Sequence, residues 1–198
     1  MSAIAGIIHW SGHPVQDALL QDMLATVPYR GQDGVHTWTQ GPVGVGCRLM
    51  ACTPLSVGEK IPLVEQGCVL ALDGRLDNRA ELASSLGTSP YTPDDQLTLA
   101  AYHKWGDSFV QRLVGDFALA LWDGPRQRLV CARSPMGVKP LYFYPGPDGF
   151  LVASEIRQLF AYPGVPCRLN QARATLFLLA HDNQTQETLY QGVSRLPA

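Results

Sequence analysis

The sequence carries little charge and no long apolar run. Charged residues make up 16% of the 198 residues, the formal net charge is -2, and basic residues are scattered rather than clustered. A nucleic-acid-binding or polybasic membrane surface is therefore not expected. No stretch approaches the ~20 apolar residues of a membrane-spanning helix, and the first ten residues lack the basic start of a signal peptide. The sequence predicts a cytoplasmic protein without a nucleic-acid or membrane partner.

Motifs for disulfides, metals and phosphates are also missing. The five cysteines are odd in number and show no Cys-x-x-Cys spacing, so reduced and mostly buried thiols are expected. Cys47 and Cys52 flank Arg48, but core packing is the favoured interpretation for both. The five histidines have no metal-ligand spacing, and no P-loop or glycine-rich phosphate cradle occurs. Neither a metal nor a cofactor is expected in this chain.

The pattern of apolar residues predicts an α+β protein. With 46% hydrophobic residues and no repeat or linker, residues 1–198 are expected to form one domain. Asn78 is expected to cap a helix, with Glu81 completing a capping box. Short apolar runs predict strands at 3–10, 35–38, 43–50, 68–72, 117–122, 129–132, 141–144 and 150–153. Helical spacing predicts helices at 17–27, 78–86, 93–105, 155–160 and 170–179.

A series of motifs runs through nearly the whole chain in a characteristic order. They are Met1-Ser2-Ala3-Ile4-Ala5-Gly6, Arg30-Gly31-Gln32-Asp33-Gly34, Gly46-Cys47-Arg48-Leu49, Asp73-Gly74-Arg75, Gly115-Asp116-Phe117-Ala118, the stretch from Ala132 to Tyr142, and Ser154-Glu155-Ile156. Together they resemble the glutamine-hydrolysing domain of asparagine synthetases and other class II amidotransferases. The order is more specific than any single motif. The resemblance implies the four-layer αββα sandwich of the N-terminal-nucleophile hydrolases.

The second residue departs from the family. The family opens Met-Cys-Gly-Ile-x-Gly and uses the cysteine, freed by loss of Met, as its nucleophile, whereas this chain has Ser2 there. In such a site the α-amine of the nucleophile, with a pKa of ~8, serves as its general base. A serine hydroxyl is much harder to deprotonate than a thiol. Ser2 is therefore either a weak N-terminal nucleophile or only a small residue at the chain end.

The resemblance places the oxyanion hole at Asp73 and Gly74, where a second departure occurs. The family has an asparagine at the position of Asp73, and its amide helps to donate to the tetrahedral oxyanion. A carboxylate only accepts hydrogen bonds and would repel that charge. Losing one such donor typically costs ~2.7–4 kcal/mol. Arg75 also replaces the glutamate that would contact the substrate's amino group. We expect that glutaminase activity has been lost.

Two further substrate-binding residues are implied by the resemblance. Arg48 matches the arginine that holds the glutamine carboxylate through a bidentate fork. Asp94 matches the acid that pairs with the α-ammonium of the substrate. Each has an alternative role that the sequence leaves open. Arg48 could pair with a nearby acid, Asp73 included, and Asp94 could simply favour a helix N-terminus.

The family joins this domain to an ATP-dependent synthetase domain, of which this chain contains nothing. ATP and magnesium are therefore expected only in that missing domain, which would be the principal partner. Members without the cysteine resemble the branch that closes amide rings within one substrate, and the segments around Leu49 and Asp73 look most like lasso-peptide cyclases. The first hypothesis is a degenerate glutaminase-like domain of a peptide macrocyclase, with the precursor peptide as a further partner. The alternatives are an active glutamine-hydrolysing domain or amidohydrolase using Ser2, and a separate interaction module.

Overall fold

Two antiparallel sheets form the centre of the molecule. The computed structural model describes residues 1–51, 55–59, 61–181 and 186–197. Within these residues, a six-stranded sheet has the order β10-β8-β9-β1-β3-β2 and a four-stranded sheet the order β4-β5-β6-β7. The strands are β1 (Ala3–His9), β2 (Gly34–Gln40), β3 (Val43–Leu49), β4 (Leu63–Glu65), β5 (Cys68–Leu76), β6 (Gly115–Asp123), β7 (Arg128–Arg133), β8 (Tyr142–Pro145), β9 (Gly149–Ala153) and β10 (Ser194–Arg195).

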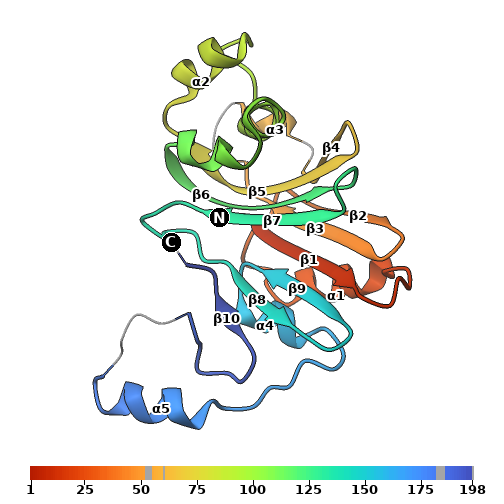
Figure 1. The fold of residues 1–198 in the computed structure, drawn as a ribbon, viewed down its shortest axis with the longest axis vertical. Helices are drawn as coiled ribbons and strands as arrows, with labels where there is room; N and C mark the ends of the chain where they lie inside the picture. The colour runs from red at the N-terminus through yellow and green to blue at the C-terminus, as the bar shows by residue number, and fades with distance from the viewer. Residues whose placement is uncertain (52–54, 60, 182–185, 198) are drawn as a thin grey trace.

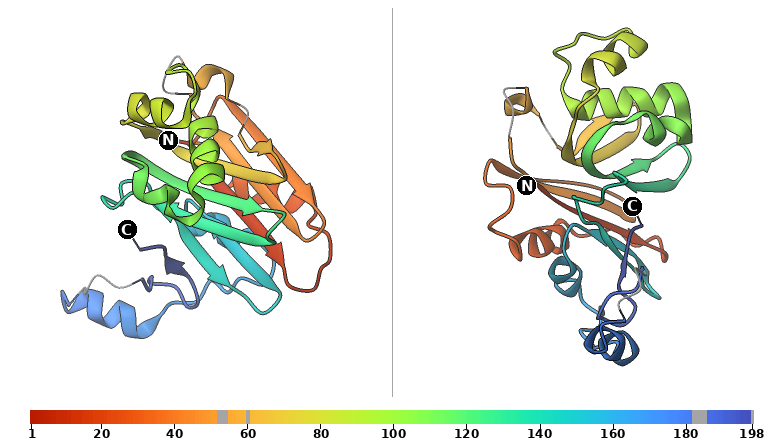
Figure 2. Two further views of the ribbon diagram at one scale, coloured as in Figure 1. Left: turned by 45° about the horizontal axis from the view of Figure 1, so that its top comes forward. Right: turned by 90° about the vertical axis from the view of Figure 1, so that its left-hand side faces the viewer.

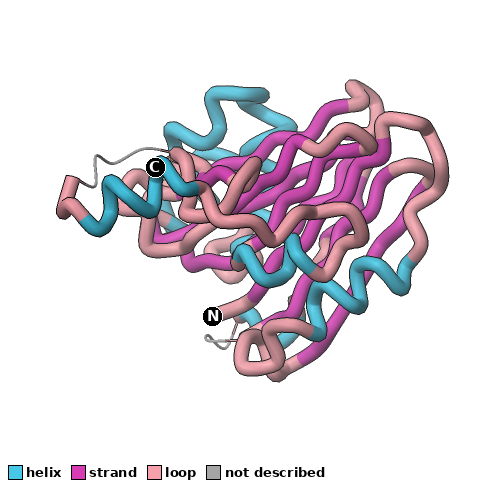
Figure 3. The backbone as a smooth tube through the Cα atoms, turned by 90° about the horizontal axis from the view of Figure 1, so that it is seen from below, coloured by secondary structure: helices cyan, strands magenta, loops and turns pink. Residues whose placement is uncertain are grey.

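Helices cover the outer faces of both sheets. α2 (Arg79–Leu86) and α3 (Asp94–Trp105) lie on the four-stranded sheet, and α1 (Asp17–Ala25) and α4 (Ile156–Phe160) lie on the six-stranded one (Figure 1). Figure 3, seen from below, shows helices lying over the strands on that side. The predicted α+β sandwich of four layers is confirmed. A fifth helix, α5 (Gln171–Leu178), projects from the body of the molecule (Figure 2).

The first strand is buried on both faces, which explains its unbroken apolar run. Ile4 packs in the core between the two sheets, whereas Ile7 faces the other way and packs with Leu20 and Leu24 of α1. Residues that alternate along a strand point to opposite faces, so a strand covered on both sides needs apolar residues throughout. This burial anchors the chain immediately after Ser2, at one end of the sandwich.

Several element boundaries differ from those predicted. β5 continues beyond residue 72 to Leu76, so Asp73 and Gly74 belong to a strand that pairs with β6. The apolar pattern that predicts a strand stops at residue 72, because Asp73 and the residues after it lie where the strand leaves the core and reaches a pocket. The short strands β4 and β10 were not predicted, and the helices η1 (Ser56–Gly58) and η2 (Gly106–Arg112) are of the 3-10 type.

The predicted capping box at Asn78 is wrong. Asn78 precedes α2, but its side chain makes no cap hydrogen bond. Its amide nitrogen donates instead to the carbonyl oxygen of Arg112, and its amide oxygen accepts from the Val114 N–H. The side chain therefore ties α2 to the loop before β6. A capping box does occur at α4, between Glu155 and Gln158.

Candidate functional site

Ser2 lies in a buried position directly before β1. The residue is only 5% exposed, and each of its polar groups is engaged. Its backbone N–H donates to Asp73 Oδ1 at 3.0 Å, and its carbonyl accepts from Arg30 Nη1 at 3.0 Å. The Met50 N–H donates to Ser2 Oγ at 3.0 Å. Among the described residues this is the only hydrogen bond of the hydroxyl, so no side chain there accepts its proton.

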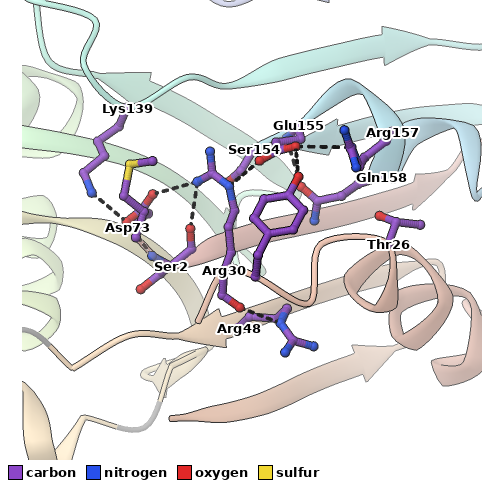
Figure 4. Close-up of polar contacts among 12 residues, drawn as sticks. Ser2, Thr26, Arg30, Arg48, Asp73, Lys139, Ser154, Glu155, Arg157 and Gln158 are labelled. Atoms are coloured by element: carbon purple, nitrogen blue, oxygen red, sulfur yellow. Dashed lines mark hydrogen bonds and ion pairs between the residues drawn. The ribbon is translucent and has the colours of Figure 1, made fainter. Parts of the chain in front are cut away.

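Asp73 is held between two cations. Its carboxylate, on a residue that is 2% exposed, lies 3.1 Å from Lys139 Nζ and 3.6 Å from Arg30 Nη1 (Figure 4). Together with the Ser2 N–H, these groups occupy both carboxylate oxygens. Two cations and a backbone N–H therefore hold this carboxylate in place beside Ser2. The position that donates to an oxyanion in the family therefore holds a fixed, hydrogen-bond-accepting charge.

Arg30 connects this cluster to the opposite side of the site. Its Nε donates to Glu155 Oε1 at 2.5 Å, and Tyr29 Oη donates to Glu155 Oε2 at 2.5 Å. Burial acts to raise the pKa of Glu155, but the hydrogen bonds from Tyr29 and Arg30 outweigh it and leave that pKa below its usual range. Arg30, which is buried, thus bridges the loop after α1, β5 and the start of α4 through buried Asp73 and half-buried Glu155.

A pocket of about 350 Å³ opens in front of Ser2. Its described lining carries the carboxylates of Glu59, Asp73, Asp94 and Asp116 against the cations Arg75 and Lys139. Asp73 and Gly74 come from β5, Ser2 from the chain start, and Lys139 from the loop between β7 and β8. The structure therefore brings Ser2, Asp73, Gly74, Arg75 and Asp94 of the predicted set to one pocket.

Arg75 and Asp94 each have a partner within the protein. Arg75 Nε lies 2.7 Å from Asp77 Oδ1, at an exposed position, and this hydrogen bond raises the pKa of Arg75. Asp94, in the first turn of α3, pairs with Arg79 and accepts the Leu76 N–H at 3.0 Å. Its carboxylate thereby joins α2, α3 and the end of β5. The role of either residue toward a substrate stays a prediction.

Arg48 does not line the pocket within the described residues. Its Nε donates to the carbonyl oxygen of Arg30 at 2.8 Å and its Nη2 to that of Pro28 at 3.4 Å. The alternative ion pair with Asp73 is wrong, because Arg30 and Lys139 occupy that carboxylate. Arg48 instead fixes the loop that carries Arg30.

The turn at Gly31 is the tightest backbone contact of the site. Gly31 has a φ of +52°, and a Cβ there would lie 2.3 Å from the carbonyl oxygen of Arg48. We expect Gly31→Ala to destabilise the protein by more than about 1 kcal/mol, because it combines an unfavourable φ with a backbone clash. Urea denaturation measures the change. Gly41→Ala is the matched control, since Gly41 has the same φ of +52° but nothing within 4 Å; an equal loss in both variants would contradict this expectation.

Glu59 makes the pocket sensitive to pH. Burial, assisted by the charge of Asp95, raises the pKa of Glu59 to about 7. Since this folded-state value exceeds the ordinary pKa of ~4.3, the contribution of Glu59 to stability is expected to be fully present below about pH 4 and to be lost as pH rises through 7. The loss is about 1 kcal/mol, because Glu59 is only half-buried and water screens its charge.

Urea midpoints at pH 5 and pH 8 measure this dependence. In Glu59→Gln the decrease of the urea midpoint from pH 5 to pH 8 is expected to disappear. Glu65→Gln, which alters an exposed acid on β4, should retain it. If Glu59→Gln keeps the full decrease, another group is responsible.

Other expectations concern cysteines, metals and membranes. The four described cysteines are free thiols: Cys47 and Cys68 are buried, Cys131 is half-buried and Cys167 is exposed. Burial raises the pKa of the Cys47 thiol, so that group is unreactive. Cys52 lies outside the described residues.

No group of three or more His, Cys, Asp or Glu residues in the described part of the chain could hold a metal ion. Within the same residues, no helix has both the length and the apolar character that crossing a bilayer requires.

Three residues of the site were not assigned a role from the sequence. Arg30 and Lys139 both lie inside motifs that the resemblance covers. The sequence did not show which acidic residue either of them would contact. Their roles follow only from the placement of Asp73 between them. Glu59 begins a segment, Glu59-Lys60-Ile61-Pro62-Leu63, that also resembles the lasso-peptide cyclases, but that resemblance assigned the residue no role.

Two facing sheets between helical layers, with a polar pocket at the start of the first strand, define a domain of the N-terminal-nucleophile amidotransferase class. In solved structures, glutamine phosphoribosylpyrophosphate amidotransferase from B. subtilis, complexed with ADP and GMP, has this fold with a TM-score of 0.63 and 20% identity, over 81% of this chain and 43% of that one. A structure of the allosteric regulatory enzyme of purine biosynthesis matches with a TM-score of 0.64 and 19% identity, over 81% of this chain and 43% of that one.

Sequence comparison identifies the family. The family model described as the glutamine amidotransferase domain matches residues 1–198, and the chain belongs to this family. It is 29% identical over 180 residues to asparagine synthetase [glutamine-hydrolyzing] 2 of Bacillus subtilis, covering 88% of this chain and 24% of that protein. It is 26% identical to asparagine synthetase [glutamine-hydrolyzing] 3 of the same organism, covering 99% of this chain and 33% of that protein. The chain thus spans a quarter to a third of these relatives.

Proposed function

We propose that this chain is a catalytically degenerate glutaminase-like domain of an ATP-dependent amide ligase related to the asparagine synthetases. The observation that carries the proposal is the pairing of Asp73 with Ser2. The Asp73 carboxylate accepts the Ser2 N–H, and the hydroxyl of Ser2 has no hydrogen-bond acceptor among the described residues. A serine hydroxyl beside a fixed negative charge is poorly suited to form an anionic tetrahedral intermediate, even with the α-amine that removal of Met1 would free as a base.

The remainder of the ligase is proposed to lie in a second domain. Relatives are three to four times as long as this chain, and the activity of such a domain would need ATP and magnesium. The arm around α5 exposes apolar side chains, with Phe177 59% and Leu178 83% exposed. Such a patch is typical of a surface that another domain covers. The domain would then serve as a structural or docking partner.

The reaction proposed for the whole enzyme is ring closure within a peptide, as in lasso-type macrocyclases. A ring-closing ligase takes its amine from the substrate and needs no ammonia from glutamine, so a glutaminase site would be dispensable. The asparagine synthetases among the relatives carry "glutamine-hydrolyzing" in their names. For this chain, the charge at Asp73 supports the reaction that does not need glutamine.

Glutamate release from glutamine tests the proposal. After removal of Met1, verified by intact mass, the protein is expected to release no more glutamate than its Ser2→Ala variant. In the longer polypeptide that carries this domain, Ser2→Ala should leave ATP-dependent amide formation unchanged. Glutamate release that depends on Ser2 would establish the alternative, a hydrolase with an N-terminal serine.

A further inference from the structure

A second surface lies at the edge of the four-stranded sheet. β7 is the last strand of that sheet, and β6 pairs with it on one side only. Within the described residues, the backbone of 128–133 makes no hydrogen bond on the other side. Edge strands with free N–H and C=O groups are templates for the addition of another strand. In the part of the chain that the structure describes, the cavity beside this edge shares no lining residue with the pocket at Ser2.

The face of β7 that points between the sheets is apolar along most of its length. Leu129 and Cys131 line a cavity of about 550 Å³, opposite Phe150 of β9. Phe150 stacks on Phe143 of β8 with ring centroids 5.7 Å apart. Since the opposing sheet has six strands against four, it extends past β7 toward β8 and β10 (Figure 1). An added strand would have this wider sheet beneath it.

The same face ends in positive charge. Alternation along β7 places Arg133 on the side of Leu129 and Cys131. Among the residues that the structure describes, its buried Nε has no hydrogen-bond partner, and its Nη1 reaches only the Gly137 carbonyl oxygen at 3.5 Å. Burial, together with the charge of Arg195, lowers the pKa of Arg133. Neither arginine forms an ion pair among the described residues, so a carboxylate placed here would find two unpaired guanidinium groups.

A second copy of this chain fits the edge poorly. Antiparallel pairing of two β7 strands about their centre would set Arg128 of one copy opposite Arg133 of the other. Like charges directly opposite each other destabilise a strand pair. An extended partner with apolar side chains and an acid is complementary instead.

We propose that β7 binds an extended peptide from a separate molecule. The peptide adds a fifth strand to the sheet, places alternate apolar side chains in the cavity beside Phe150, and sets a carboxylate opposite Arg133. This binding does not depend on whether the site at Ser2 hydrolyses glutamine.

The peptide Asp-Thr-Val-Thr-Leu-Thr-amide, labelled with fluorescein at its N-terminus, tests the proposal by fluorescence polarisation. In antiparallel register its Asp lies opposite Arg133, its Val opposite Cys131 and its Leu opposite Leu129. We expect a Kd of about 100 µM, as for a small, transient contact, and about tenfold weaker binding to Arg133→Glu. A peptide with Lys in place of Asp should bind Arg133→Glu better than the unaltered protein. Arg168→Glu, at an exposed position, should leave both affinities unchanged.

Amide hydrogen exchange locates the contact and separates it from unfolding. Peptide binding is expected to slow exchange at amides of β7 and not at those around Ser2. A thermal melt of Arg133→Glu that matches that of the unaltered protein shows that the fold is intact. Absence of binding, equal binding of the Asp and Lys peptides, protection away from β7, or a dimer through β7 in solution would each overturn the proposal.

Discussion

The double variant Ser2→Cys/Asp73→Asn, with Met1 removed, is expected to release glutamate from glutamine at least about 10²-fold faster than Ser2→Cys alone. The single change supplies a thiol, whose pKa of ~8.5 makes it a far better nucleophile than a hydroxyl. It leaves Asp73 in place, so the carboxylate still faces the developing oxyanion. The second change replaces an acceptor by an amide that donates to it.

The comparison isolates the charge at position 73. Ser2→Cys/Asp116→Asn is the matched control, because Asp116 also lines the pocket but makes no contact with Ser2 among the described hydrogen bonds and ion pairs. Its activity should equal that of Ser2→Cys. If Ser2→Cys alone is as active as the double variant, Asp73 does not suppress hydrolysis, and the serine accounts for the whole loss.

The framework of the fold could be predicted because it depends on patterns that the sequence displays directly. The unbroken apolar run of β1 reflects burial on two faces, and the apolar residues that predicted α3, among them Leu97, Leu99 and Tyr102, are buried. The extension of β5 through Asp73 could not be predicted from an apolar pattern. The end of this strand lines the polar pocket rather than the core, so its residues are polar. The capping role predicted for Asn78 was wrong for a related reason. Its side chain donates to the carbonyl oxygen of Arg112, 34 residues away in sequence, and residue spacing within the helix cannot predict so distant a contact.

The site itself could be predicted only in part. The motifs identified Ser2 and Asp73 and the loss of a donor, since these are properties of single positions. The partners of Asp73 depend on the folding of distant segments onto one point: Arg30 follows α1, and Lys139 lies 66 positions after Asp73. The sequence therefore offered Arg48 as a neutralising cation, whereas the structure uses Arg30 and Lys139. Charge balance inside a site is a tertiary property.

Arg30→Ala is expected to cost about 3–5 kcal/mol of stability, since it removes one partner from a buried ionic cluster and leaves the others uncompensated. Arg30 is 6% exposed and contacts Asp73, Glu155 and the Ser2 carbonyl. Its loss would leave Asp73 with Lys139 and deprive Glu155 of its closest cation. The free energy of unfolding in urea measures the effect.

Arg75→Ala serves as the control for this loss. Arg75 also pairs with an aspartate, but both side chains are largely exposed, and exposed pairs contribute little because water and salt screen them. Its unfolding midpoint should match that of the unaltered protein. A small effect of Arg30→Ala, comparable to that of Arg75→Ala, would mean that water enters the cluster and replaces the guanidinium. Asp73 would then not be a rigidly held charge, and its position beside Ser2 would no longer account for an inactive glutaminase site.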